Sequence, residues 1–257
     1  MADAPILELK GVSKNFGAVQ ALTKVDFETR GGEVMALVGD NGAGKSTLIK
    51  GVAGIYSFEE GDTYIDGQKV EIHGPREAAD LGIEIVYQDL ALADNLDVVN
   101  NMFLGRELIG SLRMLDEVKM EQAALETLDS LSVTTIRSVR QQVASLSGGQ
   151  RQAIAVAKAV MWNSRLVILD EPTAALGVAQ TRQVLDLVRR LADRGLGVVI
   201  ISHNLHDIFE VSDRITVLRL GHKVALFEAN KTTQQEVVHA ITAGTLSHVP
   251  GMDEVEA

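Results

Sequence analysis

A glycine-rich segment with a lysine and two hydroxyl residues is the first part of the sequence that could carry out chemistry. Residues 39–47 have the sequence GDNGAGKST, which matches the phosphate-binding pattern G-x-x-x-x-G-K-S/T. Its glycines allow backbone N–H groups to turn toward a phosphate, Lys45 can reach the β- and γ-phosphates, and the Ser46 hydroxyl can ligate Mg²⁺. The segment predicts a nucleoside triphosphate site made of Gly39, Asp40, Asn41, Gly42, Ala43, Gly44, Lys45, Ser46 and Thr47.

Two acidic residues follow a short apolar run later in the chain. Residues 166–171 have the sequence LVILDE. Asp170, at the end of the expected strand, is placed to hold Mg²⁺ through water, and Glu171 can polarise an attacking water as a general base. A strand that ends in a solvated acidic turn has the same pattern. The phosphate-binding segment in the same chain favours the catalytic interpretation.

A second anion-binding helix start is predicted at residues 146–150, which have the sequence LSGGQ and precede a helical run. Ser147 can cap this helix, and Gly148 and Gly149 let a phosphate approach its N-terminal amides. Because the chain already has one phosphate loop, a second such site needs a reason. A second copy of the chain supplies one.

The elements that must position these residues are typical of an α/β fold. Four short apolar runs, at residues 34–38, 83–87, 166–169 and 198–201, predict buried strands of a parallel sheet, with helical patterns between them. Residues 6–26 alternate around two glycines and predict antiparallel pairing. Near the C-terminus, a hairpin is expected at Gly221–His222. A last helix is expected to start at a capping box of Thr233 and Glu236 and to end near Gly244.

The strand pattern is absent from about residue 90 to residue 160, where we expect an inserted helical subdomain. Asp116 can cap one of its helices. Apolar residues recur along that helix at Val118, Ala124, Leu125, Leu128 and Leu131. The acidic pair Glu59–Glu60 is expected to be a solvated turn, and the polar, acidic tail 245–257 is expected to be disordered.

The composition excludes several classes of protein. The 257 residues include 24 basic and 35 acidic side chains, a formal net charge of −11, and no cysteine. The lack of cysteine excludes a disulfide frame, a thiol nucleophile and a cysteine-based zinc site. The acidic balance disfavours nucleic acid and anionic lipid, whose phosphates need basic partners. No apolar run approaches the roughly 18 residues of a membrane span, and the N-terminus lacks a signal-peptide pattern. The sequence therefore predicts a soluble, cytoplasmic protein.

The ordered set GDNGAGKST, Gln88, LSGGQ, LVILDEPT and His203 resembles the ATP-binding cassette of ABC transporters, over residues 6–244. The resemblance implies a P-loop ABC nucleotide-binding domain at residues 1–244, with an antiparallel β subdomain and an inserted α-helical subdomain at about 90–160. It implies ATP and Mg²⁺ as ligands. It also implies a head-to-tail dimer, in which Ser147, Gly148, Gly149 and Gln150 of one copy contact the ATP on the phosphate loop of the other.

The same resemblance assigns roles to single residues. Gln88 is then the glutamine that contacts Mg²⁺ and senses the permease, so that Ser46, Gln88 and Asp170 are the metal ligands. His203 contacts the γ-phosphate and acts with Glu171 and Lys45 in catalysis, although a lone histidine after a strand can also be structural. Phe16 matches the aromatic residue that stacks on adenine; plain core packing is its alternative.

One position departs from the pattern of the family. After EPT the family often has S-A-L-D, whereas residues 174–177 here are AALG. Gly177 replaces the aspartate, which puts in doubt how tightly the two ATP sites are coupled. Activity is still expected, because the residues assigned to hydrolysis are all present.

Three further segments, NLDVVNNMFLGRE, EPTAALGV and ISHNLHDIFEVSDRITVLRLG, resemble cassettes of bacterial importers for ribose, xylose or fructose, in a single-cassette form. This implies a peripheral subunit on the cytoplasmic side of the membrane. An integral membrane permease would dock near Gln88 and residues 90–106, and an extracytoplasmic sugar-binding protein would deliver the sugar. An importer for another solute, such as branched-chain amino acids, is an alternative. A soluble ABC ATPase acting on nucleic acid or ribosomes is disfavoured by the single cassette and the negative charge.

Overall fold

The computed structural model describes residues 4–110 and 113–244. Its central sheet has six strands in the order β10-β9-β3-β8-β7-β6. Strands β3 (Val34–Val38), β6 (Ile83–Val86), β7 (Leu166–Asp170) and β8 (Gly197–Ile201) are parallel, as the four apolar runs predicted. Strand β9 (Arg214–Arg219) is parallel to β3, and β10 (His222–Glu228) is antiparallel to β9. Leu220 and Gly221, both with positive φ, form the predicted hairpin turn.

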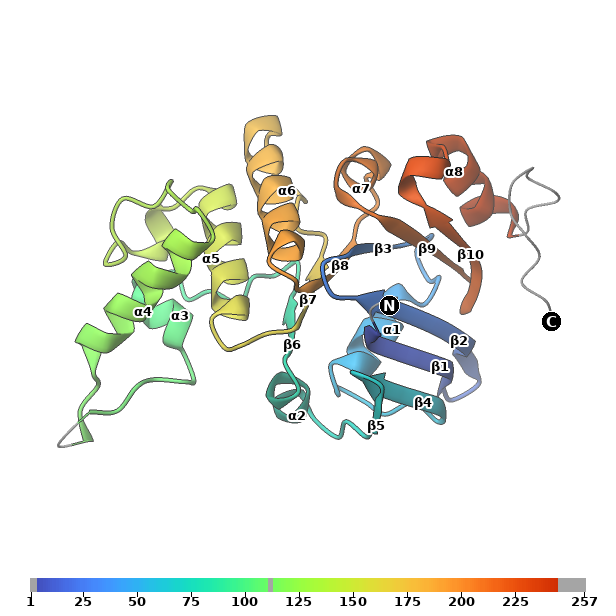
Figure 1. The fold of residues 1–257 in the computed structure, drawn as a ribbon, viewed down its shortest axis with the longest axis horizontal. Coiled ribbons are helices and arrows are strands. Elements are labelled where there is room, and N and C mark those ends of the chain that lie inside the picture. The colour runs from blue at the N-terminus through green and yellow to red at the C-terminus, as the bar shows by residue number, and fades with distance from the viewer. Residues whose placement is uncertain (1–3, 111–112, 245–257) are drawn as a thin grey trace.

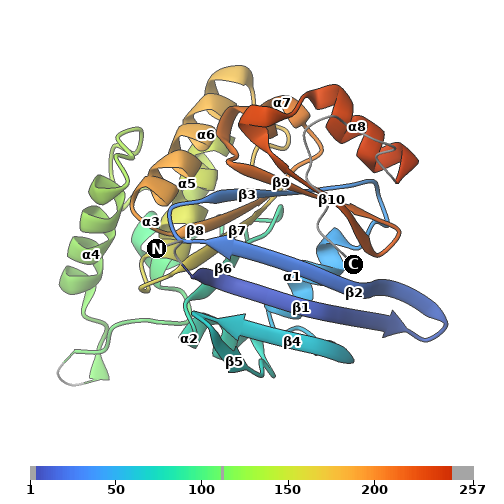
Figure 2. The same cartoon turned by 45° about the vertical axis from the view of Figure 1, so that its right-hand side comes forward.

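A second, antiparallel sheet forms the other layer (Figure 2). Its order is β2-β1-β4-β5, with β1 at Pro5–Phe16, β2 at Val19–Arg30, β4 at Glu60–Ile65 and β5 at Gln68–Val70. The antiparallel pairing predicted for residues 6–26 is confirmed. Helix α1 (Lys45–Val52) packs between the two sheets, because its buried Leu48 and Ile49 belong to the same apolar cluster as Leu9 of β1 and Leu37 of β3. This helix begins at the phosphate-binding segment.

Helices cover the opposite face of the central sheet (Figure 1). Side chains of β3 alternate between the two faces: Met35 and Leu37 face α1, whereas Val34 and Ala36 belong to the cluster that includes α5, α6, α7 and α8. Helices α6 (Val178–Asp193), α7 (Leu205–Val211) and α8 (Gln234–Ala243) follow β7, β8 and β10 in turn. The capping box predicted at the start of α8 is present, and Gly244 ends the helix in a left-handed conformation.

The segment between β6 and β7 contains helices joined by loops and extends to one side of the molecule (Figure 1). It contains α3 (Val98–Phe103), α4 (Glu117–Ser130), the short 3-10 helix η2 (Val143–Ser145) and α5 (Gly148–Val160), while α2 (Pro75–Asp80) precedes β6. Within the described residues, no helix is long and apolar enough to cross a membrane. The tail 245–257, for which disorder was predicted, lies outside the described residues.

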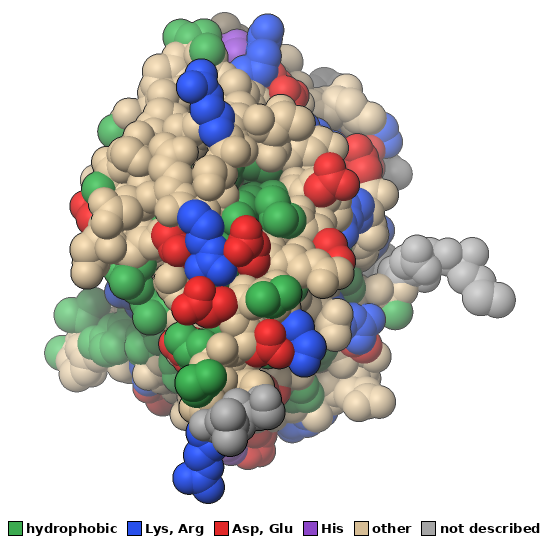
Figure 3. Space-filling view, turned by 90° about the vertical axis from the view of Figure 1, so that its left-hand side faces the viewer, with side chains coloured by type: hydrophobic (Ala, Val, Ile, Leu, Met, Phe, Trp, Pro, Cys, Tyr) green, Lys and Arg blue, Asp and Glu red, His purple; other side chains and the backbone are tan. Residues whose placement is uncertain are grey.

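Of the apolar residues predicted to face the core along α4, Ala124, Leu128 and Leu131 are buried, whereas two others are exposed. The Asp116 side chain accepts from the Lys119 N–H, so the predicted cap is confirmed. The two exposed residues are Val118, at 77%, and Leu125, at 50%. They lie seven residues apart, hence on one side, while the buried Met120, Ala124 and Leu128 repeat every four residues on another. Figure 3 shows this side of the molecule, where apolar side chains are scattered between charged ones.

Candidate functional site

The phosphate-binding segment lies between β3 and α1, and its backbone depends on glycine. Gly39, Gly42 and Gly44 all have positive φ angles of 151°, 81° and 103°. A Cβ on Gly39 would lie 2.2 Å from the Leu218 carbonyl oxygen, and a Cβ on Gly44 would lie 2.8 Å from the Ala21 carbonyl oxygen. Helix α1 has no side-chain cap, so the N–H groups of its first turn are left for a ligand. The loop and the helix start together form a cradle for an anion.

Lys45 occupies the inside of this loop. Its Nζ donates to the carbonyl oxygens of Gly39, at 2.6 Å, and Asp40, at 3.0 Å. Burial lowers the pKa of Lys45, while the negative charges of Glu171, Asp40 and Asp170 oppose this shift. The structure therefore brings the lysine of the phosphate loop within electrostatic reach of both acids that follow β7.

Asp170 and Glu171 occupy the carboxyl end of β7. Burial raises the pKa of Asp170, the negative charge of Glu171 adds to this, and the charge of Lys45 opposes it. Glu171 adopts a left-handed φ of 51°, which is uncommon for a residue with a side chain. Its N–H donates to the Ile201 carbonyl oxygen on the neighbouring strand, at 2.9 Å. The turn after β7 is thus tied to the end of β8.

The same arrangement brings Glu171 and His203 together. Glu171 Oε2 lies 2.8 Å from His203 Nδ1, with the Glu171 side chain 17% exposed and the His203 side chain 81% exposed. The contact lacks hydrogen-bond alignment, and this buried Oε2 has no hydrogen-bond partner among the described residues. An unpaired buried carboxylate oxygen is a costly arrangement that a water molecule or ligand would relieve.

These residues fit a magnesium ion that is bound together with phosphate. Among the described residues, no group of three or more acids and histidines could hold a metal alone. Mg²⁺, however, usually keeps several waters and takes one or two carboxylates plus substrate phosphates. Asp170 supplies a carboxylate and Ser46 a hydroxyl at the start of α1. This donor set suits an ion that arrives with a nucleotide.

Gln88 lies two residues beyond the end of β6, next to β7 in the sheet, and is exposed. The residue before it, Tyr87, lies near Asp170, because the preceding Val86 pairs with Leu169 across the sheet. Burial raises the pKa of Tyr87, and the Asp170 charge raises it further. The structure thus places Gln88 beyond the same sheet edge as the acids. No described hydrogen bond joins it to Ser46 or Asp170.

Phe16 is exposed at the end of β1, with 48% of its surface accessible, so it is not a core residue. Its ring meets Tyr56 edge to face, with centroids 5.3 Å apart. Lys14 Nζ lies 5.5 Å from the Phe16 centroid and forms an ion pair with Glu59. Glu59 is exposed in a bend, as predicted for a solvated turn, although Glu60 already begins β4. The Glu59 carboxylate also holds the lysine beside the aromatic pair. Sequence reasoning missed Lys14 and Tyr56, whose proximity to Phe16 depends on the pairing of distant segments.

The LSGGQ segment forms the start of α5. The Ser147 hydroxyl accepts from the Gln150 N–H at 3.3 Å, and the Gln150 side chain accepts from the Ser147 N–H at 2.9 Å, which confirms the predicted cap. A Cβ on Gly148 would lie 2.8 Å from Leu176, so this turn packs on the loop that follows Glu171. In the part of the chain that the structure describes, no hydrogen bond joins residues 147–150 to residues 39–47.

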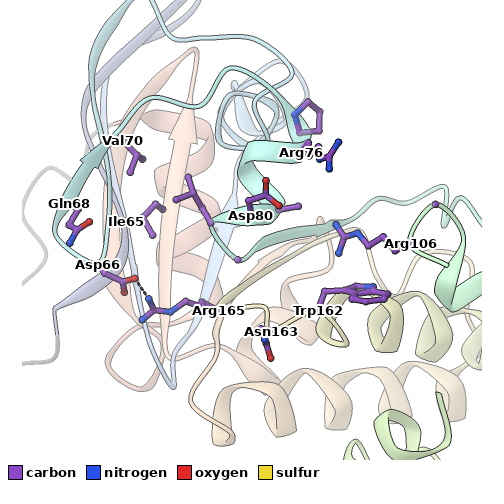
Figure 4. A pocket seen from close by; sticks show the side chains of 15 residues that line it. Ile65, Asp66, Gln68, Val70, Arg76, Asp80, Arg106, Trp162, Asn163 and Arg165 are labelled. Carbon is purple, nitrogen blue, oxygen red and sulfur yellow. Dashed lines mark hydrogen bonds and ion pairs between the residues drawn. The ribbon is translucent and has the colours of Figure 1, made fainter. Parts of the chain in front are cut away.

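A groove of about 1170 Å³ opens elsewhere, between α2, the β4–β5 turn and the connection from α5 to β7 (Figure 4). Arg165 forms an ion pair with Asp66 on one side of it. On the other side, Arg106 contacts Glu84 at 2.9 Å and stacks over Trp162, 5.4 Å from its ring. The groove contains none of the predicted nucleotide-binding residues.

Comparison with known proteins identifies the family. The family model for the ABC transporter matches residues 22–174. The chain is 44% identical to the fructose import ATP-binding protein FrcA of Rhizobium meliloti, covering 94% of this chain and 95% of that one. It is 45% identical to the xylose/arabinose import ATP-binding protein XylG of Sulfolobus acidocaldarius, covering 95% and 96%. The ribose import ATP-binding protein RbsA of Caldanaerobacter subterraneus is 38% identical, but the match spans only 49% of its length.

Solved structures agree with the architecture. The fold superposes with a TM-score of 0.79 on an ATP-binding cassette of an ABC transporter in its ADP conformation, 24% identical, over 93% of this chain and 95% of that one. It superposes with a TM-score of 0.72 on a dimeric ATP-binding cassette in a post-hydrolysis state bound to ADP and Pi, 26% identical, over 87% and 98%. The α/β fold with a phosphate loop is therefore confirmed, and the chain belongs to the ABC transporter family as one of its ATP-binding cassettes.

Proposed function

We propose that this protein hydrolyses ATP to power the uptake of a monosaccharide through a separate membrane permease. The contact of Glu171 with His203 beside the phosphate loop carries the proposal for hydrolysis. The similarity to fructose and xylose/arabinose import ATP-binding proteins, over nearly the whole chain, supports the transport role and the class of solute.

Each side chain has a task in hydrolysis that follows from its position. The N–H groups of the loop and of α1 bind the β- and γ-phosphates, and Lys45 moves from its loop carbonyls to them. Glu171, with its unpaired Oε2, accepts a proton from the attacking water. His203 contacts the γ-phosphate and stabilises the charge that develops on it. Ser46, Asp170 and Gln88 would hold Mg²⁺, which neutralises phosphate charge when bound.

The site becomes complete only in a dimer. No described hydrogen bond joins Ser147, Gly148 or Gly149 at the start of α5 to the phosphate loop of their own chain. We propose that they contact the γ-phosphate held by a second copy, while Phe16 stacks on the adenine of the ATP in its own chain. The similarity to a dimeric cassette bound to ADP and Pi supports this arrangement.

The permease would dock on the surface around Gln88 and residues 90–106. This segment connects β6, which neighbours the strand of Asp170 and Glu171, with the helical region 90–160. Movement of the permease would then reach the nucleotide site through this segment. A peripheral position on the cytoplasmic side of the membrane and an extracytoplasmic sugar-binding protein complete the proposed system.

Affinity purification from detergent-solubilised native membranes tests the transport role. We expect to recover a permease with several membrane spans, and recovery of ribosomes or nucleic acid instead would contradict it. The binding protein encoded with that permease is then titrated with monosaccharides and with branched-chain amino acids. Binding of a monosaccharide supports the proposed solute, and binding of only an amino acid points to the other importer class.

A further inference from the structure

Asp207 is a buried carboxylate that none of the roles described above uses. It lies in the first turn of α7 and is only 3% exposed. A buried carboxylate is costly unless hydrogen bonds satisfy both of its oxygens. Here both are satisfied: Thr173 Oγ1 donates to Oδ2 at 2.7 Å, and Asn204 Nδ2 donates to Oδ1 at 2.9 Å.

The two donors come from the two loops that carry the proposed hydrolytic residues. Thr173 lies two residues after Glu171 in the loop that follows β7, and Asn204 directly follows His203 in the loop after β8. Asn204 is itself fixed, because its N–H donates to the buried Ser202 hydroxyl at 3.0 Å. Asp207 therefore joins through side chains the same two loops that bring Glu171 and His203 into contact at 2.8 Å.

We propose that Asp207 is a positioning residue for ATP hydrolysis, which sets the separation of Glu171 and His203 through Thr173 and Asn204. Without Asp207, the backbone hydrogen bond from the Glu171 N–H to the Ile201 carbonyl oxygen would be the remaining one described between the two loops. A tie at the strand ends leaves the loop tips free to move apart. Because Glu171 also holds a left-handed φ, its loop needs such outside support. This inference rests on the proposed roles of Glu171 and His203.

The test uses donor and acceptor exchange in the full-length chain. Asp207→Leu removes both acceptor oxygens, and Asn204→Asp places two carboxylates against each other, so each of these single variants loses the bond between residues 204 and 207. Asp207→Asn alone keeps a carbonyl oxygen that can accept from the Asn204 amide, so it serves only as one half of the exchange. The Asn204→Asp/Asp207→Asn double variant restores it with reversed polarity, and the Asn204→Asp change keeps an acceptor for the His206 N–H at the helix cap. Glu210→Gln, on the same helix but outside the network, is the matched control.

The measurements are the kcat of phosphate release, the Kd of a fluorescent ATP analogue and the thermal unfolding midpoint. We expect Asp207→Leu and Asn204→Asp each to lower kcat about tenfold or more, because small misplacements of catalytic groups cost one to two orders of magnitude. ATP affinity stays within about twofold, since the phosphate loop is untouched. The double variant is expected to recover most of the lost kcat. Glu210→Gln is expected to leave all three quantities unchanged.

Two results would overturn the proposal: Asp207→Leu and Asn204→Asp variants whose kcat stays near that of the wild type, or a double variant that recovers its unfolding midpoint but not its kcat. If the variants at Asp207 do not fold, Thr173→Val removes only the hydroxyl that reaches Asp207 and must lower kcat by itself. Glu171→Gln is measured in parallel. If it retains hydrolysis, the proposed role of Glu171 fails; if it is inactive while Asp207→Leu and Asn204→Asp are normal, only the positioning role fails.

Discussion

The Glu171→Gln variant separates the proposed chemical role of this side chain from its contribution to folding. The amide keeps the size of the side chain but cannot accept a proton from water. A positioned general base contributes about 10²- to 10⁴-fold in rate, so we expect kcat to fall by that factor, which corresponds to about 3–5 kcal/mol of activation free energy. ATP binding is expected to persist, because the loop of Gly39 to Thr47 and Lys45 are unchanged.

We expect Glu171→Gln to change the free energy of unfolding only slightly, and to raise it, although the same variant lowers kcat. Glu171 Oε2 is buried without a hydrogen-bond partner, and the Glu171 charge adds to the burial that raises the pKa of Asp170. Neutralising Glu171 removes this repulsion but also weakens the attraction to Lys45 and His203. We therefore expect a stability change between zero and about +1 kcal/mol, or up to about 4 °C in the unfolding midpoint of a chain of this size.

The assay combines phosphate release at saturating Mg-ATP, light scattering and thermal unfolding. Since hydrolysis would reset the dimer, the inactive variant should accumulate as an ATP-bound dimer that the wild type does not retain. Glu126→Gln, an exposed glutamate on α4, serves as the matched control and should behave as wild type in all three assays. A Glu171→Gln variant that hydrolyses ATP within a few-fold of the wild-type rate would refute the assignment. A Glu171→Gln variant that lost activity and whose unfolding midpoint also fell by several degrees would show a structural role instead.

Four further predictions follow from single positions. Gly39→Ala should abolish ATP binding in a fluorescence titration, because the new Cβ would lie 2.2 Å from the Leu218 carbonyl oxygen; wild-type affinity would contradict the loop geometry. Gly177→Asp should fold normally and raise stability by a few tenths of a kcal/mol, since the site is open, φ is −76° and aspartate caps α6 better than glycine; a lower unfolding midpoint would count against it. Phe16→Ala should weaken ATP analogue binding by about 1 kcal/mol while Phe16→Tyr does not; equal affinities would remove the adenine role. Asp170→Asn should gain stability relative to the wild type as pH rises, because the raised pKa of Asp170 means that the wild type loses stability when this carboxyl ionises. The gain should be below about 1 kcal/mol after solvent screening and should vanish below the ordinary pKa of 3.8. Denaturant unfolding across pH measures it.

The sequence predicts the parts of this protein that depend on local pattern. The four apolar runs are strands because short β-branched segments between breakers have few other ways to bury themselves. The phosphate loop is predictable because its backbone requires glycine at positions with positive φ, so the requirement can be recognised from the residue types alone. The same holds for the caps of α5 and α8, where a hydroxyl and a residue three positions later form a reciprocal pair.

What the sequence does not predict depends on contacts between distant segments. The buried face of α4 includes Met120 rather than Val118, because the neighbouring helices decide which apolar side chains are covered. The ion pair of Lys14 with Glu59 joins residues 45 positions apart beside Phe16. Asp207 and Thr173, which are 34 positions apart, have no shared pattern that would connect them. Such pairs become visible only when the sheet order is known.

The loop that follows Glu171 links the two ends of the proposed dimeric mechanism. Its first part carries Glu171, the proposed general base, and Thr173, which donates to Asp207, and its last part carries Leu176, on which Gly148 of the LSGGQ turn packs. A displacement at one end therefore moves groups that would serve two different ATP molecules. Because Gly177 has no side chain, coupling that ran along this loop would pass through packing and not through a polar side-chain contact at that position.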